Sequence, residues 1–179
     1  MRPAGSAAEA CGRAAAQHLR SSALLARARR VALFASLADE IPTRPVFDLL
    51  HDLGRSALLP RIVRGDGLVF AGLARWEDLR PGPFGVGEPR ADAPRVELGP
   101  GDLVLVPGLG FDRRGRRLGR GGGHYDRTFP PGAAAPALLG LAFACQLVDE
   151  IPSGAHDRWM DGIVTEQGVL HAARREGGR

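Results

Sequence analysis

A stretch of arginines and glycines near the middle of the chain carries the residue types best suited to binding phosphate. It contains Arg113, Arg114, Arg116, Arg117, Gly119, Arg120, Gly121, Gly122 and Gly123, followed by His124, Tyr125 and Asp126. Glycine lets main-chain N–H groups approach phosphate oxygens, and arginine supplies paired donors and positive charge. If residues 124–129 open a short helix, its N-terminus favours the same anion. The stretch therefore predicts an anion-binding loop.

Asp126 adds a requirement to this prediction. A carboxylate among phosphate-binding groups repels the ligand unless a divalent cation lies between them. Mg²⁺ is commonly bound by one or two carboxylates together with substrate phosphates. The residues therefore indicate a magnesium nucleotide or a phosphorylated substrate.

Other interpretations of the stretch remain open, because arginines and glycines also form solvated loops and nucleic-acid-binding patches. The sequence has neither a Walker A motif nor a G-x-G-x-x-G motif. Arginine is spread along the whole chain, whereas a nucleic-acid groove gathers basic residues on one face with aromatic residues. We expect no nucleic-acid partner.

Composition limits the possible classes of protein. A chain of 179 residues, 44% of them hydrophobic, is long enough for one domain (1–179) with a substantial core. The net charge is +4 and every basic residue is arginine, so Schiff-base chemistry and a Walker lysine are excluded. Cys11 and Cys145 stand far apart and indicate buried thiols in a reducing compartment. Without a membrane-length apolar run or a signal-peptide core, we expect a cytoplasmic monomer with no membrane partner.

The elements that must position the loop follow from apolar patterns. The run at residues 103–106 stops at Pro107 and Gly108, as a buried parallel strand does, and ligands of open α/β sheets bind beyond such ends. We expect further strands at residues 31–35, 57–63, 68–71, 138–144, 162–165 and 169–170, and helices at residues 6–19, 43–54 and 124–129. Strands that alternate with helices predict an α/β protein with a parallel or mixed sheet.

Local signals add detail to these elements. Ser6 to Glu9 fits a capping box, Thr43 an N-cap, and Gly12 a weak point in the first helix. Pro60 predicts an edge or bulged strand. The five prolines of residues 81–100 predict a loop. Phe84 and the preceding Trp76 either anchor this loop to the core or line the site. Residues 172–179 are expected to be a disordered tail.

Three segments together resemble the 5-formyltetrahydrofolate cyclo-ligase (methenyltetrahydrofolate synthetase) family. They are LVPGLGFDRRGRRLGRGGGHYDR at residues 105–127, FGVGEP at 84–89 and IPSGAHDRWMDGIVTEQGV at 151–169. The resemblance runs from residue 6 to residue 170. It implies a three-layer α/β fold with a Rossmann-like, mostly parallel sheet flanked by helices.

The resemblance also implies an activity. The family cyclises 5-formyltetrahydrofolate to 5,10-methenyltetrahydrofolate, using ATP and Mg²⁺ and releasing ADP and phosphate. The alternative from another class is a non-catalytic folate- or nucleotide-binding relative. It would have lost turnover with the basic N-terminal helix that family members ordinarily carry before the first helix expected here. The sequence starts without that helix and has no lysine, so either Arg2 or the loop arginines supply its charge or ATP binds weakly.

The family's site residues carry over onto matching positions. For ATP binding these are Arg117, Gly119, Arg120, Gly121, Gly122, Gly123 and Tyr125, with Arg120 and Tyr125 in catalytic roles. For substrate binding they are Glu40, Arg120, Gly121, Gly122, Gly123 and His124, and for Mg²⁺ they are Asp126 and Asp157. Glu40 is implied to accept N–H donors of the pterin. His124 replaces the family's usual tyrosine and adds a titratable ring. The neighbouring His156 is assigned no chemistry.

Overall fold

The computed structural model describes residues 1–63, 67–131, 134–154 and 157–173. Within these residues an eight-stranded sheet has the order β13-β12-β10-β7-β1-β2-β3-β6. Its strands are β1 (Val31–Ala32), β2 (Ala57–Val63), β3 (Gly67–Leu73), β6 (Arg95–Val96), β7 (Leu103–Val106), β10 (Ala137–Leu141), β12 (Gly162–Thr165) and β13 (Gly168–His171). The run from β12 through β10, β7 and β1 to β2 is parallel, and β3, β6 and β13 pair antiparallel. The predicted α/β class with a mostly parallel sheet is confirmed.

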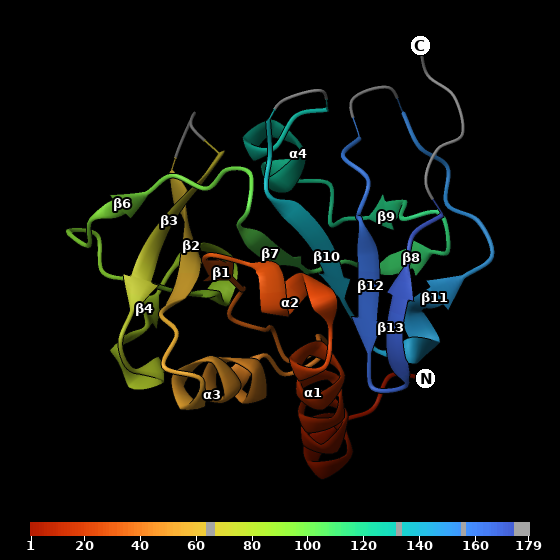
Figure 1. Cartoon of the computed structure of the whole chain (residues 1–179), viewed down its shortest axis with the longest axis horizontal. Helices are drawn as coiled ribbons and strands as arrows, with labels where there is room; N and C mark the ends of the chain where they lie inside the picture. Colours follow the sequence, from red (N-terminus) through yellow and green to blue (C-terminus); the bar gives the residue numbers. More distant parts are fainter. Residues whose placement is uncertain (64–66, 132–133, 155–156, 174–179) are drawn as a thin grey trace.

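The side chains of β7 show how the sheet separates two cores. Successive residues of a strand point to opposite faces. Leu103 and Leu105 pack into one core with the helices α1 (Gly5–Arg20), α2 (Ala23–Arg27) and α3 (Arg44–Asp52). Val104 and Val106 pack into a second core on the other face. Figure 1 shows α1 and α3 together at one end of the view and α4 (His124–Thr128) at the opposite end.

The first helix forms as predicted, but its start and its glycine differ. The buried residues Ala8, Gly12, Ala15, Ala16 and Leu19 follow the helical period. The N-cap is Ala4 without a side-chain cap, so the predicted capping box at Ser6 is wrong. Gly12 lies so close to the Pro42 carbonyl oxygen that an added Cβ would be 2.7 Å from it. The glycine is therefore a close-packing position as well as a weak helix former.

The third helix buries its predicted apolar face except at its end. Thr43 is the N-cap residue, but its hydroxyl donates to the Phe34 carbonyl at 2.6 Å and caps no helical N–H group. Leu53 is 41% exposed because the helix ends at Asp52. Gly54 follows with φ +66°, the left-handed conformation that commonly stops a helix.

Strand β2 is internal to the sheet, so the prediction of an edge or bulged strand from Pro60 is wrong for the strand as a whole. The pairing of β1 with β2 ends at Leu58, two residues before Pro60. The N–H of Ile62, which points to the same side as position 60, bonds instead to the Glu88 carboxylate at 2.9 Å. The N–H group that Pro60 lacks would point to this same side, where β2 no longer pairs with β1. Its absence therefore breaks no hydrogen bond between strands.

The face of the sheet opposite α1 to α3 is covered by chain that packs into the second core, including Phe111, Tyr125 and Leu147, whereas Trp76, Leu79 and Val86 pack against the first core. A small sheet of order β11-β8-β9 comprises β8 (Gly110–Asp112), β9 (Arg117–Leu118) and β11 (Leu147–Val148), and it was not predicted. The proline-rich segment is mostly irregular, as expected. Residues 76–100 hold only short pieces, namely η1 (Trp76–Asp78), β4 (Arg80–Pro81), η2 (Pro83–Gly85), β5 (Gly87–Glu88) and β6. The 3-10 turn η3 (Ala144–Gln146) precedes β11.

Several predicted bounds change. All of residues 31–35 are buried, but only Val31 and Ala32 pair as strand. Strand β10 ends at Leu141, and the closing β12–β13 hairpin is confirmed. Of the predicted tail, Ala172 and Ala173 donate main-chain hydrogen bonds to Asp161 and Arg113, and residues 174–179 lie outside the described part, as does His156.

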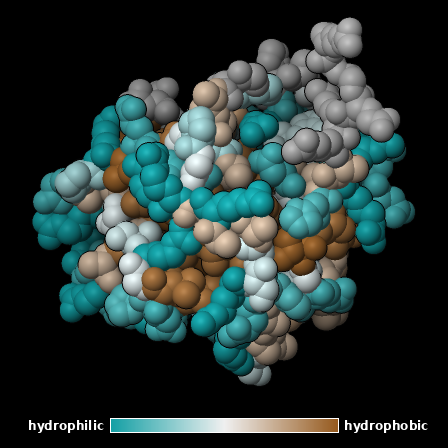
Figure 2. Space-filling view, viewed as in Figure 1, coloured by the Kyte–Doolittle hydropathy of each residue, from teal (hydrophilic) through white to brown (hydrophobic). Residues whose placement is uncertain are grey.

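The described helices include none that combines the length and the apolarity needed to cross a bilayer. Figure 2 shows a largely hydrophilic surface on the face viewed, with hydrophobic residues in small groups near α3 and near β12 and β13.

Candidate functional site

Glu40 and Arg120 meet at the carboxyl ends of β1 and β7. Glu40 closes a turn in which its carboxylate accepts the Leu37 N–H at 2.9 Å. The Nε of Arg120 lies 3.6 Å from Glu40 Oε1, and the Glu40 side chain is only 10% exposed. A buried carboxylate at the strand ends and an arginine from the glycine-rich loop, far apart in sequence, are thus brought together.

The electrostatics of Glu40 suit a ligand with N–H donors. Burial raises the pKa of its carboxyl group, and the Leu37 N–H and the Arg120 charge offset this only in part. A buried carboxylate whose lost hydration is only partly replaced by hydrogen bonds is stabilised when a further N–H group donates to it.

Arg117 links two of the predicted residues to each other. Its Nη2 lies 3.0 Å from Asp126 Oδ2, and its guanidinium carbon lies 5.6 Å from the centre of the Tyr125 ring. Its side chain is 9% exposed, and its buried Nε has no hydrogen-bond partner among the described residues. A buried guanidinium N–H without a partner indicates a missing acceptor, such as a phosphate oxygen.

Tyr125 stays protonated at this position. Burial raises the pKa of its hydroxyl, with Arg117 acting in the opposite direction and Glu40 in the same direction. The phenol is therefore a hydrogen-bond donor at neutral pH.

Asp126 and Asp157 line one cavity of about 430 Å³, together with Gly123, Arg127, Pro130 and Pro131. The N–H of Arg158, the residue after Asp157, donates to Asp126 Oδ1 at 3.2 Å and so connects the two segments. Asp157 itself accepts the Gly154 N–H at 2.7 Å. The structure brings the two predicted metal residues to the same cavity.

The donor set fits Mg²⁺ better than a metal bound wholly by protein. No cluster of three or more His, Cys, Asp or Glu side chains able to hold a metal ion occurs among the described residues. Mg²⁺ uses one or two carboxylates and completes its shell with water and phosphate oxygens. Asp126 and Asp157 could supply that number of carboxylates.

The glycines of the loop have two different roles. Gly121 and Gly123 have φ angles of +83° and +61°, which other residues adopt only with strain. Gly119 and Gly122 lie against side chains, because an added Cβ would be 2.7 Å from Arg117 Nη1 and 2.8 Å from the His124 ring, respectively. They allow the chain to pass close to both.

His124 lies at the edge of this cluster. Its Nδ1 lies 3.4 Å from Nη2 of Arg127, and its carbonyl accepts the Thr128 hydroxyl at 2.7 Å. That hydroxyl also accepts the Leu68 N–H at 2.9 Å, which ties α4 to the start of β3.

The interpretation of all five arginines as an anion cradle is wrong for Arg116. Its side chain is 10% exposed and binds Asp112 at 2.6 Å and Glu150 at 3.0 Å. Arg113 and Arg114 are exposed. The loop therefore directs Arg117 and Arg120 toward the other predicted residues.

Three supporting residues were missed by the sequence analysis. Buried Asp112 accepts the N–H groups of Arg114, Arg116 and Ile151 and so fixes the arginine turn. Gln146 donates to the carbonyls of residues 108 and 109. Asp39 binds Arg2 and Arg120. Only Asp39 had a signal, since it directly precedes Glu40.

Trp76 and Phe84 behave differently. Trp76 packs edge-on against Phe47 at 5.4 Å and is partly buried against the core. Phe84 is 81% exposed and has a φ angle of +59°. An exposed aromatic side chain on a strained backbone anchors nothing, and such strain concentrates at functional sites.

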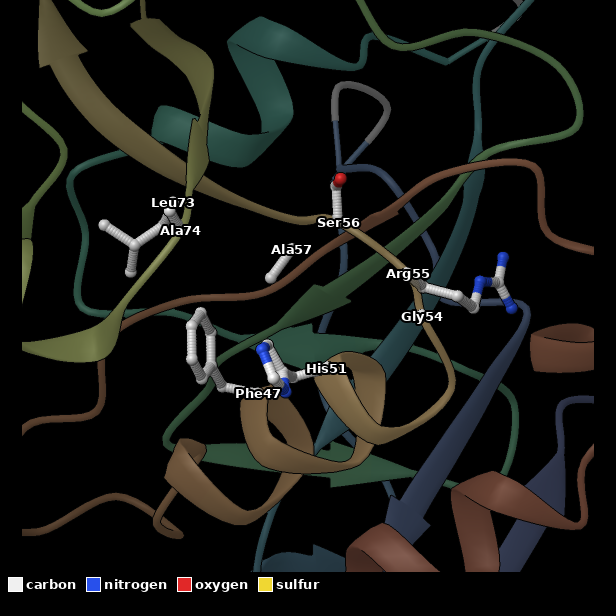
Figure 3. A pocket seen from close by; sticks show the side chains of 8 residues that line it. All are labelled: Phe47, His51, Gly54, Arg55, Ser56, Ala57, Leu73 and Ala74. Atoms are coloured by element: carbon white, nitrogen blue, oxygen red, sulfur yellow. The ribbon is translucent and has the colours of Figure 1, made fainter.

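A second cavity lies at the amino end of a strand, away from the carboxyl ends where Glu40 and Arg120 meet. It measures about 290 Å³ and is lined by Phe47, His51, Gly54, Arg55, Ser56, Ala57, Leu73 and Ala74. Ala57 begins β2, so the cavity lies at the amino end of that strand. Figure 3 shows the Arg55 side chain pointing away from the space beside Phe47, and its Nη1 donates to the Leu25 carbonyl at 2.8 Å.

Comparisons with known proteins show which proteins this chain resembles. The model of the 5-formyltetrahydrofolate cyclo-ligase family matches residues 3–166. The chain is 35% identical to the 5-formyltetrahydrofolate cyclo-ligase of Mycolicibacterium smegmatis, covering 86% of this chain and 81% of the relative. It is 30% identical to that of Escherichia coli K12, covering 88% and 89%. The structure of Aquifex aeolicus 5,10-methenyltetrahydrofolate synthetase superimposes with a TM-score of 0.74 at 28% identity, covering 94% and 84%.

Proposed function

Because the chain belongs to the 5-formyltetrahydrofolate cyclo-ligase family, we propose that it catalyses the ATP- and Mg²⁺-dependent cyclisation of 5-formyltetrahydrofolate to 5,10-methenyltetrahydrofolate. ADP and phosphate are the other products. The observation that carries the proposal is that Nε of Arg120 lies 3.6 Å from the Glu40 carboxylate. Arg117, which contacts Tyr125 and Asp126, belongs to the same arginine- and glycine-rich stretch as Arg120.

The reaction needs positioning and charge neutralisation more than covalent help from the protein. The formyl oxygen attacks the γ-phosphorus, the bond to the β-phosphate oxygen breaks, and ADP leaves. The N-10 nitrogen then attacks the activated carbon, phosphate leaves with the former formyl oxygen, and the N-10 proton is released. Both steps place negative charge on phosphate oxygens, which arginine guanidinium groups stabilise.

The proposed roles are those that the resemblance to the family implies. Arg117, Gly119, Arg120, Gly121, Gly122, Gly123 and Tyr125 hold the triphosphate. Arg120 and Tyr125 also donate to the transferred phosphoryl group. Glu40 accepts the N–H donors of the pterin, and His124 lies with the loop glycines on the folate side. The buried Nε of Arg117, which has no protein partner among the described residues, supports a phosphate acceptor at this point.

Asp126 and Asp157 would hold Mg²⁺ at the shared cavity. When bound, the ion supplies charge neutralisation to the phosphate oxygens. Asp126 is already oriented by Arg117 and by the Arg158 N–H, so the protein prearranges one ligand.

The test is to mix the purified chain with 5-formyltetrahydrofolate, ATP and Mg²⁺ and to follow methenyl absorbance together with ADP. Equal amounts of both products are expected. ADP without the methenyl product, or neither product at high enzyme concentration, contradicts the proposal. Calorimetry then detects the non-catalytic alternative as folate binding without ATP hydrolysis. Nothing in the comparisons favours that alternative.

We further expect a cytoplasmic monomer with a single domain. Sedimentation analysis tests the oligomeric state, and cell fractionation tests the location.

A further inference from the structure

The carboxylate of Asp39 binds two arginines that come from opposite parts of the chain. Nη2 of Arg120 lies 2.6 Å from Oδ1 and 2.7 Å from Oδ2. Nη1 of Arg2 lies 3.0 Å from Oδ2 and also donates to the Asp39 carbonyl at 2.9 Å. One residue of the turn after β1 thus joins the start of the chain to the glycine-rich loop.

Arg2 extends this connection to the loop after β7. Its Nη2 donates to the Leu109 carbonyl at 3.2 Å. Gln146 donates to the same carbonyl at 3.2 Å and to that of Gly108 at 2.7 Å. The Asp39 carboxylate is therefore also bound by Arg2, a side chain that is itself hydrogen-bonded to the loop after β7.

These contacts contribute little to folding but strongly limit the direction of Arg120. The side chains of Asp39 and Arg120 are 51% and 46% exposed, and ion pairs so exposed add little stability. Nη2 of Arg120 is held by Asp39 while Nε faces Glu40 at 3.6 Å. Nη2 and Nε of the guanidinium thus each face a carboxylate. An arginine fixed in this way avoids part of the entropy cost of ordering when a phosphoryl group arrives.

We propose that Asp39 is a positioning residue that holds Arg120 beside Glu40 for the cyclisation reaction, and that Arg2 keeps the Asp39 carboxylate in place. The inference rests on the proposed function, in which Arg120 donates to the transferred phosphoryl group. The hydrogen bond from Arg120 also holds the pKa of Asp39 below its usual value, so the pair is ionised at neutral pH.

The kinetic test is Asp39→Asn, which keeps the size of the side chain and removes its charge. We expect kcat to fall about tenfold, as for the loss of one charged hydrogen bond, while KM for folate changes less than twofold. In an Arg120→Gln background the same change should have no further effect on kcat, because the group that Asp39 positions is gone. The Arg2→Gln change should lower kcat by less, and combining it with Asp39→Asn should add nothing.

Asp48→Asn is the matched control. Asp48 is 53% exposed and pairs with Arg44 at 2.8 Å, and it is assigned no role in the site. Its loss should leave kcat unchanged. If Asp39→Asn leaves kcat unchanged, raises it, or lowers it equally in the Arg120→Gln background, the positioning role is overturned.

A second measurement separates this inference from the proposed function. NMR relaxation of the Arg120 Nε–H group, assigned by comparison with Arg120→Gln, reports the mobility of the side chain without any turnover. Asp39→Asn should lower its order parameter, and Asp48→Asn should not. A wild-type chain without cyclo-ligase activity refutes the proposed function. An order parameter unaffected by Asp39→Asn refutes the role of Asp39 whether or not the chain is active.

Discussion

Nη2 of Arg117 lies 3.0 Å from Oδ2 of Asp126, and this ion pair joins the phosphate-binding and metal-binding parts of the candidate site. Asp126 Oδ1 accepts the Arg158 N–H at 3.2 Å. Each oxygen of the carboxylate therefore has one donor and keeps a lone pair for a cation. The pair fixes the orientation of Asp126 before any ligand binds.

The Asp126→Asn change removes a charge from the proposed Mg²⁺ site and leaves the side chain nearly the same size. We expect the Mg²⁺ concentration needed for half-maximal activity to rise about 10- to 100-fold, the range seen when groups around a bound metal are altered. Folate affinity should be unchanged, because Glu40 is untouched. Mg²⁺ titration of activity and folate calorimetry check this. Equal loss of both, in a protein with unchanged circular dichroism, contradicts the metal assignment.

The Arg117→Lys change keeps the charge and removes the forked donor geometry. A lysine cannot pair with Asp126 and also present an N–H where Nε now lies. We expect kcat/KM for ATP to fall about 10- to 100-fold, the effect of one or two charged hydrogen bonds. Steady-state kinetics with ATP varied at saturating folate measures it. Exposed Arg113→Lys is the control and should behave as wild type.

The Phe84→Gly change separates stability from substrate binding. Glycine relieves the strain at φ +59° at the cost of a more flexible unfolded chain, so the two effects nearly cancel and the thermal midpoint should hardly move. If the exposed ring contacts folate, KM for folate should rise about tenfold, as for loss of an aromatic contact worth about 1.5 kcal/mol. A lower thermal midpoint with unchanged KM would show that the ring is structural.

The Gly140→Ala change tests how the hairpin of β8 and β9, which carries Arg116 and Arg117, packs on the large sheet. An added Cβ would lie 2.5 Å from Phe111, a fully buried residue of β8. We expect a loss of about 1–3 kcal/mol in the free energy of unfolding from overpacking, with reduced activity as the hairpin shifts. Urea unfolding measures the loss. Gly72→Ala in β3 is the control, since nothing lies within 4 Å of its added Cβ. Similar losses in both variants would contradict the docking interpretation.

Asp102 should make folding stability depend on pH. Although burial acts to raise it, hydrogen bonds from Arg30, the Gly99 N–H and Arg29 hold the pKa of this carboxyl below its usual range. A lowered pKa in the folded state gives stability that is complete above the unfolded value of about 4 and is lost as pH falls further. We expect Asp102→Asn to cost about 1–3 kcal/mol at neutral pH, the worth of hydrogen bonds to a charged group.

Urea unfolding of wild type and Asp102→Asn at a series of pH values checks this prediction. The difference in the free energy of unfolding between the two proteins should decrease as the pH falls below 4. A difference that is the same at all pH values would show that the charge of Asp102 does not contribute to stability.

Short-range patterns in the sequence determined most of the regular structure. The apolar run of β7, the helical period of α1 and the turn between β12 and β13 each depend on neighbouring residues, and all three elements form as predicted. The prediction from Pro60 was wrong, and Thr43 is the predicted N-cap but bonds to the Phe34 carbonyl and not to the helix. The effect of a missing N–H group or of a hydroxyl depends on a partner strand or carbonyl that only the fold brings near.

The sequence by itself also determined the residue types of the candidate site, because the glycine-rich arginine loop and Asp126 can be read from adjacent residues and Asp157 lies in a segment that resembles the family. Only the tertiary structure decided how each arginine is paired. Buried Asp112 binds Arg116, Asp126 binds Arg117, and Asp39 and Glu40 face Arg120. The first two pairings join residues that are close in sequence, but Asp39 lies 81 positions before Arg120, so that pairing forms only once the fold has brought the two loops together.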